Sequence, residues 1–340
     1  MPVFSHHYLR GYLRECLLAV EVTEEVAGLV ADNLVESSLK GHDSHGVSML
    51  PRYIAAIRDG GLRPHAVAEK TLDAGPLISF AGQHGFGQVV ARQVIAEGIE
   101  RAQEHGVAVV GLADAHHLGR IGAWAEQAAD AGLVSLHFAN VYNRPVVMPW
   151  QGVQPRLGTN PFCAGIPVAG KAPVILDFAT SVIAGNKARI AWNEGKLLPP
   201  GCIVDNQGHP AVDPRWLMEQ PTGALLAFGQ HKGSGLAIIC SLLGAVLTGG
   251  SNERTATGKG NQIINSMLSI LIDPDRLGGN ALYQQEIPLL LEWIRQSRED
   301  GELLLPGEPE QIAYRQRVEE GIYVDDTSWG QLSQLQTQVA

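Results

Sequence analysis

The sequence predicts an α/β (α+β) fold, because helix and strand patterns alternate along the middle of the chain. Residues 86–104 carry apolar side chains at helical spacing and end at a His–Gly pair, and the apolar run 107–113 follows directly. The same order recurs in the helical pattern of 121–131 and the strand pattern of 133–141. Short buried strands that alternate with helices are typical of a sheet covered by helices.

Helices are also predicted nearer the chain ends. Residues 5–19 have apolar side chains at helical spacing, and a second helix is predicted to begin after Thr23 and to run to Leu39. A third helical piece follows the polar turn GHDSHG. The remaining elements are predicted to be strands over 173–180 and 266–273, an apolar helix over 233–250 and a helix over 282–299, with the polar end of the chain covering the surface.

Composition narrows the class of protein. The chain has 340 residues, of which 45% are hydrophobic and 18% charged, so it is a folded protein and too long for one small module. Its net charge of -10 and the absence of a basic run argue against nucleic acid or an anionic membrane as partner. Four scattered cysteines without a C-x-x-C pair argue against a structural zinc and suit a reducing, cytoplasmic location. No signal peptide or membrane span is expected.

Several well-known motifs are missing or incomplete. The chain has no G-x-G-x-x-G between a strand and a helix, which disfavours a Rossmann site. The segment GIPVAGKA begins like a P-loop, but Ala172 stands where a hydroxyl residue is needed. His42, Asp43 and His45 have the spacing of metal ligands, yet this short cluster lacks a further ligand. No metal site is therefore predicted.

Four polar segments interrupt the apolar pattern and are candidate functional sites. Ser44-His45 in the first can act as a general acid/base, or can simply form a turn that caps the next helix. The second, 115–122, lies between a strand and a helix, as an anion site or an ordinary loop. In the third, Thr159 can donate to a carboxylate or ribose, or cap a turn. The Gly-rich helix entry at Lys232 suits a phosphate.

Taken in order, these segments resemble the type 2 malate/L-lactate dehydrogenase family. The resemblance rests on SHGVSMLPRY, HHLGRIG, LGTNPF, LDFATS, HKGSGL and LLLPGE, and it runs from about residue 30 to residue 320. Within the family, GHDSHG, HHLGRIGAWAEQ, GTNPFC and PPGC are most similar to the branch called hydroxycarboxylate dehydrogenase B. Each motif is weak alone, but six in the same order are highly specific.

The resemblance implies hydride transfer with NAD or NADP between a 2-hydroxy acid and a 2-oxo acid. It implies a non-Rossmann NAD(P)-binding fold, which accounts for the missing glycine fingerprint. It also implies a homodimer, with the active site between a helical lobe made of residues 1–76 and 282–340 and an α/β cofactor-binding lobe of residues 77–281.

Matching the family motifs position by position assigns expected roles. The resemblance implies that the catalytic residues are His45, Ser44 and His117, and neither histidine is favoured as proton donor. The residues implied to bind the cofactor are His45, Gly119, Arg120, Ile121, Leu176, Asp177, Phe178, Ala179, Thr180, His231, Lys232, Asn265, Pro306, Gly307 and Glu308. Those expected to contact the substrate are Met49, Arg52, Thr159, Lys187 and Arg189.

Two departures from the family pattern bear on the substrate. Met49 stands where the family often has an arginine for the substrate carboxylate, and a thioether cannot form that ion pair. Either Arg52, Arg120 or Arg189 replaces it, or the substrate is bulkier, of the phenylpyruvate or hydroxyphenylpyruvate type. Near Lys187 the chain lacks the aspartate of the imine-reducing branch, which disfavours cyclic imine reduction.

Other functions stay open at this point. Within the family, the alternatives are a malate, lactate, sulfolactate, ureidoglycolate or diketogulonate dehydrogenase, or a cyclic imine reductase. From another class, the alternative is a nucleotide-binding protein that has lost turnover. The choice between NAD and NADP is also open, because the acidic ribose-binding residue of a Rossmann fold has no counterpart to locate.

Overall fold

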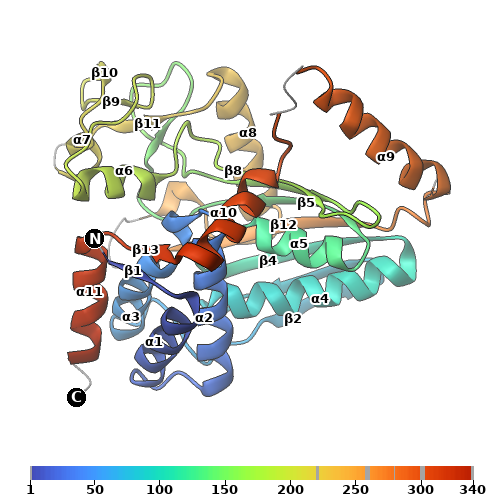
Figure 1. Ribbon diagram of the computed structural model, residues 1–340, viewed down its shortest axis with the longest axis horizontal. Coiled ribbons are helices and arrows are strands. Elements are labelled where there is room, and N and C mark those ends of the chain that lie inside the picture. Colours follow the sequence, from blue (N-terminus) through green and yellow to red (C-terminus); the bar gives the residue numbers. More distant parts are fainter. Residues whose placement is uncertain (1, 220–221, 257–260, 279, 299–302, 338–340) are drawn as a thin grey trace.

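A seven-stranded mixed sheet forms the centre of the molecule (Figure 1). The computed structural model describes residues 2–219, 222–256, 261–278, 280–298 and 303–337. Only the neighbours β3 and β4 are parallel, and the other pairs are antiparallel. The strands, in sheet order, are β2 (Glu69–Ala74), β3 (Leu77–Ala81), β4 (Val107–His116), β12 (Ile264–Ile272), β5 (Val134–Ala139), β7 (Phe162–Ile166) and β8 (Val174–Phe178). The predicted α/β class is confirmed.

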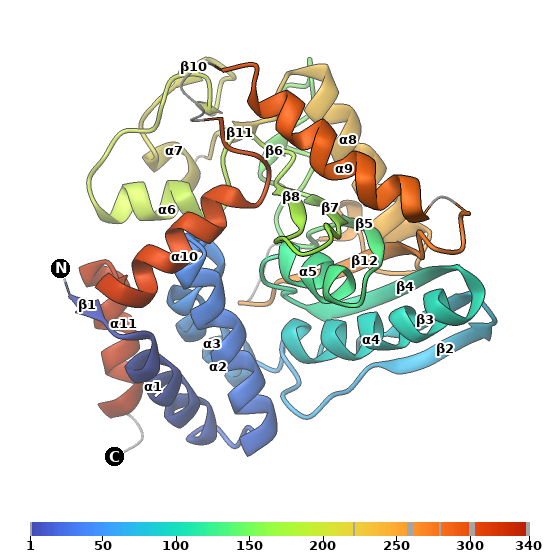
Figure 2. The ribbon, with the colours of Figure 1, turned by 45° about the vertical axis from the view of Figure 1, so that its right-hand side comes forward.

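Helices cover both faces of this sheet. On one face lie α4 (Gly87–His105) and α5 (Gly122–Asp130), which contact β4 and β7 respectively (Figure 2). On the other lie α8 (His231–Ser241) and the π-helical turn η3 (Leu242–Val246), which contact β5 and β12. The backbone of η3 approaches β5 closely at Gly244, where a Cβ would lie 2.6 Å from the carbonyl oxygen of Phe138. A side chain at this position would push the helix off the sheet.

The two chain ends pack together as a helical unit beside the sheet (Figures 1 and 2). Strand β1 (Val3–Phe4) pairs with β13 (Ile322–Tyr323), which joins the ends directly. The apolar core of this unit includes Leu13, Leu34, Tyr53 and Leu332. Its helices are α1 (His6–Leu18), α2 (Glu24–Leu39), α3 (Leu50–Arg58), α10 (Glu308–Glu320) and α11 (Asp326–Thr337), with the short turns η1 (Asp43–His45) and η2 (Val47–Met49) between α2 and α3.

A third, smaller unit was not predicted. It contains a four-stranded sheet with a core that includes Val147, Ile203 and Leu225. These strands have only two or three residues each, too few to show an alternating pattern in the sequence. In sheet order they are β10 (Pro210–Ala211), β9 (Ile203–Val204), β11 (Ala224–Leu226) and β6 (Val147–Met148), accompanied by α6 (Gly185–Asn193) and α7 (Arg215–Met218).

The predicted lobe boundaries differ from the structure in two places. The boundary at residue 76 falls inside the β2–β3 hairpin, so β2 belongs to the sheet and not to the helical unit. Helix α9 (Asn280–Arg295) lies beside the sheet, far from α1 and α11 (Figures 1 and 2). Residues 299–302 and 338–340 of the predicted helical lobe lie outside the described part of the chain.

The chain end also contains more regular structure than its composition indicates. Residues expected only to cover the surface form α10 and α11. Helix α10 has no fully buried residue, so no apolar stripe announces it. It is tied to η1 by polar contacts, because Arg317 donates to both carboxylate oxygens of Asp43. Among the described helices, none has the length and apolar character needed to span a membrane.

Candidate active site

Two imidazole rings from distant parts of the chain stack on each other. His45 lies in η1 of the helical unit, and His117 lies just beyond the end of β4. Their ring centroids are 5.4 Å apart and their planes differ by 12°. Ser44 Oγ lies 2.9 Å from Nδ1 of His45, and Tyr53 Oη lies 2.6 Å from Nδ1 of His117. The structure therefore brings together the three residues that were predicted to be catalytic.

Small residues and backbone anchors bring the histidine loops to this point. A Cβ at Gly46 would collide with Ser38 Oγ, and a Cβ at Gly87 would collide with the carbonyl oxygen of His117. Glycine therefore lets η1 approach α2, and lets α4 begin against the His117 loop. The same loop is held by Asn265, whose Oδ1 accepts from the backbone N–H of Leu118 at 2.9 Å. Its Nδ2 donates to the carbonyl oxygen of Asn140 at 2.8 Å, so both polar atoms of the Asn265 side chain bond to backbone and support the loop.

Burial and neighbouring cations keep both imidazoles neutral near pH 7. The pKa of His45 is lowered to about 3, first by burial and then by the nearby charges of His42, Arg120 and Lys187. The pKa of His117 lies well below its usual value, first because of burial and then because of His45, His116 and Arg52. The neighbours whose charges lower these two pKa values are arginine, lysine and other histidines. The surroundings of the pair therefore favour a bound anion.

Two guanidinium groups, one of them beside the pair, have buried nitrogens that no acceptor in the described part of the chain contacts. Arg120 is only 2% exposed and donates from Nη2 to Glu126, while its Nε and Nη1 are buried without a partner. Arg189 of α6 has buried Nε and Nη2 atoms in the same condition. A buried N–H donor without an acceptor is costly. Such groups suit a ligand that brings oxygen acceptors with it.

Arg52 completes the cationic side of the site. Its Nε donates to the carbonyl oxygen of Asn261 at 3.2 Å. Burial lowers the pKa of Arg52, and the nearby charge of Arg189 lowers it further. A carboxylate placed between two such guanidinium groups would relieve this repulsion and accept hydrogen bonds from both.

The end of β8 faces the start of α5. Asp177 Oδ2 accepts from the backbone N–H of Gly122 at 2.7 Å, and burial raises the pKa of this carboxyl. A Cβ at Gly122 would collide with Nη1 of Arg120 and would lie 2.9 Å from Asp177 Oδ2, so glycine lets these two side chains approach the start of α5. The loop residues Gly119 and Ile121 flank Arg120 here, and Leu176, Phe178 and Ala179 are at least partly exposed beside Asp177.

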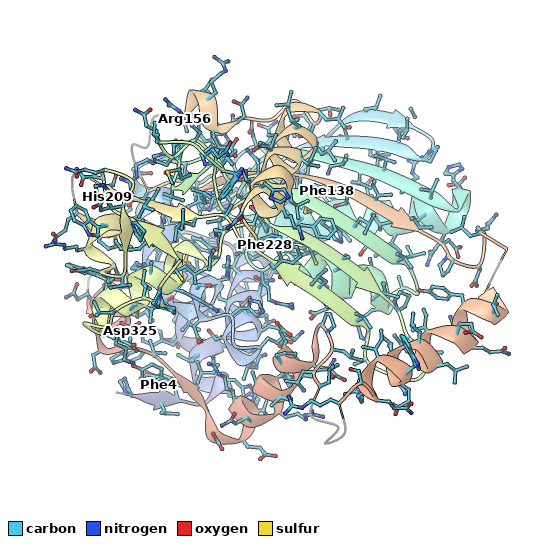
Figure 3. The ribbon with its side chains drawn as sticks, turned by 90° about the horizontal axis from the view of Figure 1, so that it is seen from above. Phe4, Phe138, Arg156, His209, Phe228 and Asp325 are labelled. Carbon is cyan, nitrogen blue, oxygen red and sulfur yellow. The ribbon has the colours of Figure 1, made fainter. Side chains whose placement is uncertain are left out.

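Two further predicted cofactor segments adjoin β8. The turn Pro306–Gly307–Glu308 packs on it, because Pro306 accepts from the backbone N–H of Ile175 at 3.3 Å and Gly307 has a φ of 93°. The carboxylate of Glu308 forms an ion pair with Arg295, whose Nη2 lies 2.6 Å from Glu308 Oε1. The segment that leads into α8 contacts β8 through Phe228, which is labelled in Figure 3 and whose ring centroid lies 5.3 Å from that of Phe178.

The entry to α8 has the backbone strain that functional loops often carry. Gln230 has φ 57° and ψ -117°, a conformation unfavourable for any residue with a side chain. His231 and Lys232 follow it and are exposed. Phe228 donates its backbone N–H to the carbonyl oxygen of Thr180 at 3.1 Å, so this exposed pair lies beside the end of β8.

The predicted substrate residues are only partly brought together. Lys187 is close enough to lower the pKa of His45, and Arg52 and Arg189 neighbour each other. Thr159 uses its carbonyl oxygen to accept from the N–H and hydroxyl of Thr180. Met49 conflicts with its predicted role, because its side chain is 0% exposed within the helical core. A buried thioether has no surface on which a substrate could rest.

Three polar residues of the site were not predicted to be functional. Tyr53, Gln88 and His116 are buried around His117. Tyr53 lies inside the SHGVSMLPRY motif, and His116 is adjacent to His117, so the sequence offered a signal for both. Gln88 sits in an otherwise ordinary helical pattern, and nothing in the sequence distinguishes it.

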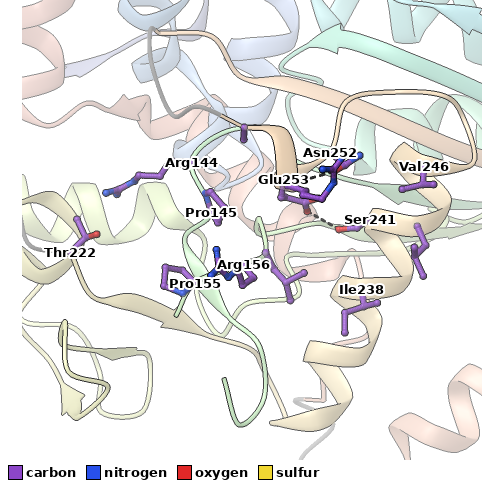
Figure 4. Close-up of a pocket in the computed structure, with 14 residues that line it drawn as sticks. Arg144, Pro145, Pro155, Arg156, Thr222, Ile238, Ser241, Val246, Asn252 and Glu253 are labelled. Atoms are coloured by element: carbon purple, nitrogen blue, oxygen red, sulfur yellow. Dashed lines mark hydrogen bonds between the residues drawn. The ribbon is translucent and has the colours of Figure 1, made fainter. Parts of the chain in front are cut away.

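A cavity of about 740 Å³ lies elsewhere, between the small sheet and the α8–η3 segment (Figure 4). Arg144, Arg156 and Arg254 line it together with the apolar Ile238 and Leu242. Glu253 at its edge is occupied by a 2.6 Å hydrogen bond from Ser241 Oγ. None of the predicted site residues lines this cavity, so it is separate from the histidine pair.

Comparison with known proteins confirms the family that the sequence motifs resemble. The family model for malate/L-lactate dehydrogenase matches residues 4–333. Hydroxycarboxylate dehydrogenase B of Escherichia coli (strain K12) is 41% identical over 330 residues, which cover 96% of this chain and 91% of that protein. L-lactate dehydrogenase of Cupriavidus necator is 37% identical, covering 96% and 95% of the two chains. The structure of a provisionally named malate/lactate dehydrogenase from E. coli superposes with a TM-score of 0.96 at 39% identity, covering 100% and 96%.

Proposed function

Because the chain belongs to the malate/L-lactate dehydrogenase family, whose members are oxidoreductases that use NADH or NADPH, we propose that it interconverts 2-oxo acids and 2-hydroxy acids at the His45–His117 pair. The observation that carries this proposal is the pair itself. Two stacked neutral imidazoles lie among Arg52, Arg120 and Lys187, an environment suited to an anionic substrate that exchanges a proton.

The residues present fit an anionic dinucleotide. Buried nitrogens of Arg120 lack acceptors among the described residues, and the cationic Lys232 is exposed beside the end of β8. The residues that would hold the cofactor are Arg120, the segment 176–180, Lys232 and the turn 306–308. When bound, NADH or NADPH supplies the hydride that reduces C2 of the oxo acid.

The protein's own part is to hold the acid and to move one proton. Arg52 and Arg189 bind the substrate carboxylate, which places the adjacent carbonyl near the histidines. The carboxylate also offsets the cationic surroundings, so His45 can take up a proton together with the substrate. His45 then donates that proton to the oxygen that becomes negative during reduction, and Ser44 holds the ring through Nδ1. In the reverse direction His45 accepts the hydroxyl proton.

The finer question is which 2-oxo acid is used. The proposal of an aryl-substituted acid loses its original basis, because Met49 is buried in the helical core. The Arg52–Arg189 subsite requires only one carboxylate and says nothing of the rest of the molecule. We therefore propose the class of 2-oxo acids and treat phenylpyruvate, hydroxyphenylpyruvate and smaller acids as members to be compared.

The proposal is tested by following the loss of reduced-nicotinamide absorbance with NADH and with NADPH. The panel contains pyruvate, oxaloacetate, phenylpyruvate, hydroxyphenylpyruvate and a cyclic imine. We expect turnover of at least one 2-oxo acid, and slower turnover of the imine. Binding of either nucleotide without turnover across the panel would instead support a non-catalytic nucleotide-binding protein.

A second proposal concerns assembly. We propose that the chain forms a homodimer, as the family resemblance implies, in which a second copy covers the apolar surface of α8 and η3. Supporting this, Leu242 and Val246 of η3 and the next residue, Leu247, are 48%, 56% and 64% exposed. Sedimentation should give about twice the monomer mass of 36.4 kDa, and a monomer at micromolar concentration would contradict the proposal.

A further inference from the structure

Behind His117 lies a buried polar chain that the reaction described above does not use. Tyr53 of α3 is fully buried, and its ring meets those of Phe86 and His116 edge-on, with centroids 6.1 and 5.4 Å away. Gln88 of α4 is 2% exposed. The hydroxyl of Tyr53 contacts Gln88 on one side and His117 on the other. Polar groups buried this deeply orient one another, because each has few alternative partners.

The donors and acceptors in this chain determine the tautomer of His117. Gln88 Nε2 can only donate, and it donates to Tyr53 Oη at 2.9 Å. The phenol proton of Tyr53 is then directed at Nδ1 of His117, 2.6 Å away. Burial raises the pKa of Tyr53, so the phenol keeps this proton. A neutral His117 that accepts at Nδ1 must carry its own proton on Nε2.

We propose that Tyr53 and Gln88 are positioning residues that hold His117 as its Nε2–H tautomer, so that His117 donates a hydrogen bond while His45 exchanges the proton. The division of labour rests on the proposed function, whereas the tautomer itself does not. The Nε2–H tautomer makes His117 a fixed donor for the substrate carbonyl oxygen. His45, which is bonded to Ser44, is then the group whose protonation changes.

The tautomer can be measured without any turnover. In ¹⁵N-histidine-labelled protein free of ligands, His117 is assigned by its loss in His117→Asn, and its two nitrogens are classified as protonated or unprotonated. We expect an unprotonated Nδ1 and a protonated Nε2. Gln88→Glu should invert this pattern, because a carboxylate accepts the phenol proton and Tyr53 must then accept from Nδ1. A protonated Nδ1 in the unmodified protein would overturn the proposal, whatever the substrate proves to be.

Kinetics test the consequence for the reaction. Tyr53→Phe should lower kcat by roughly 10- to 100-fold, the range typical when a partner that orients a functional histidine is lost, with little change in nucleotide affinity. Tyr12→Phe is the matched control, since Tyr12 is also buried and its hydroxyl donates to the backbone carbonyl of Leu332 at 2.8 Å, within the helical core. Equal kcat values for the two variants would show that Tyr53 does not position His117, and thermal melting of both identifies any loss of folding.

Discussion

Replacing His45 with alanine should lower the turnover number for 2-oxo acid reduction by about 10²- to 10⁴-fold, the usual contribution of a positioned general acid. The ring is stacked on His117 and held by Ser44, so its nitrogen is fixed in a site otherwise lined by arginine and lysine. Arginine at neutral pH cannot give up a proton, whereas an imidazole exchanges one readily, and His117, the other imidazole of the pair, is proposed to stay a fixed donor. Nucleotide affinity should stay within about twofold, because the loss concerns the chemical step.

His209→Ala is the control for this substitution. Its side chain is 70% exposed on the small unit, at the edge of the molecule in Figure 3, and it does not contact the site. Turnover measured at saturating nucleotide and oxo acid separates the chemical step from binding. An unchanged turnover number in His45→Ala would remove this residue from proton transfer and would move that role to His117.

Replacing Arg189 with methionine should raise the KM for 2-oxo acids by about 10- to 150-fold, the equivalent of about 1.5–3 kcal/mol for a hydrogen bond to a charged group. Nε and Nη2 of Arg189 are buried and have no hydrogen-bond partner among the described residues, so their acceptors are expected to come from the substrate. The melting temperature should fall only slightly, because the change removes a buried cation: burial lowers the pKa of Arg189, and the nearby countercharge of Asp325 opposes that shift.

Arg215→Met provides the comparison, since Arg215 lies on α7 with about half of its side chain exposed. A rise in KM for both variants alike would point to a general effect of net charge. A normal KM together with a strongly lowered melting temperature in Arg189→Met would show that Arg189 supports the fold of α6 and does not bind the substrate.

The parts of the fold that the sequence predicts well are long and strongly patterned. Helix α4 and strand β4 lie within one to three residues of the predicted ends, because a 19-residue amphipathic helix and a buried 10-residue strand leave a clear period. The β9–β11 strands lack enough residues for any period. Helix α10 is missed for a different reason, since polar contacts such as Arg317 to Asp43 hold it in place of an apolar stripe.

The candidate site shows the same division. His45 and His117 can be selected from the sequence because imidazoles in polar turns are chemically distinctive. Their stacking requires β4 and η1 to meet, which only the folded chain reveals. The burial of Met49 could not be predicted from the sequence, because residue type and motif position do not tell which side of a 3₁₀ turn faces the core. Gln88 becomes recognisable only through its contact with Tyr53.

The central claim is that this site recognises the carboxylate of a 2-oxo acid and reduces the carbonyl beside it. The most direct measurement compares the best 2-oxo acid of the panel with its methyl ester, under identical nucleotide and pH, by loss of reduced-nicotinamide absorbance. The ester keeps the reactive carbonyl but loses the charge that Arg52 and Arg189 would bind. We predict that kcat/KM falls by at least about tenfold for the ester, and equal values for acid and ester would contradict the account.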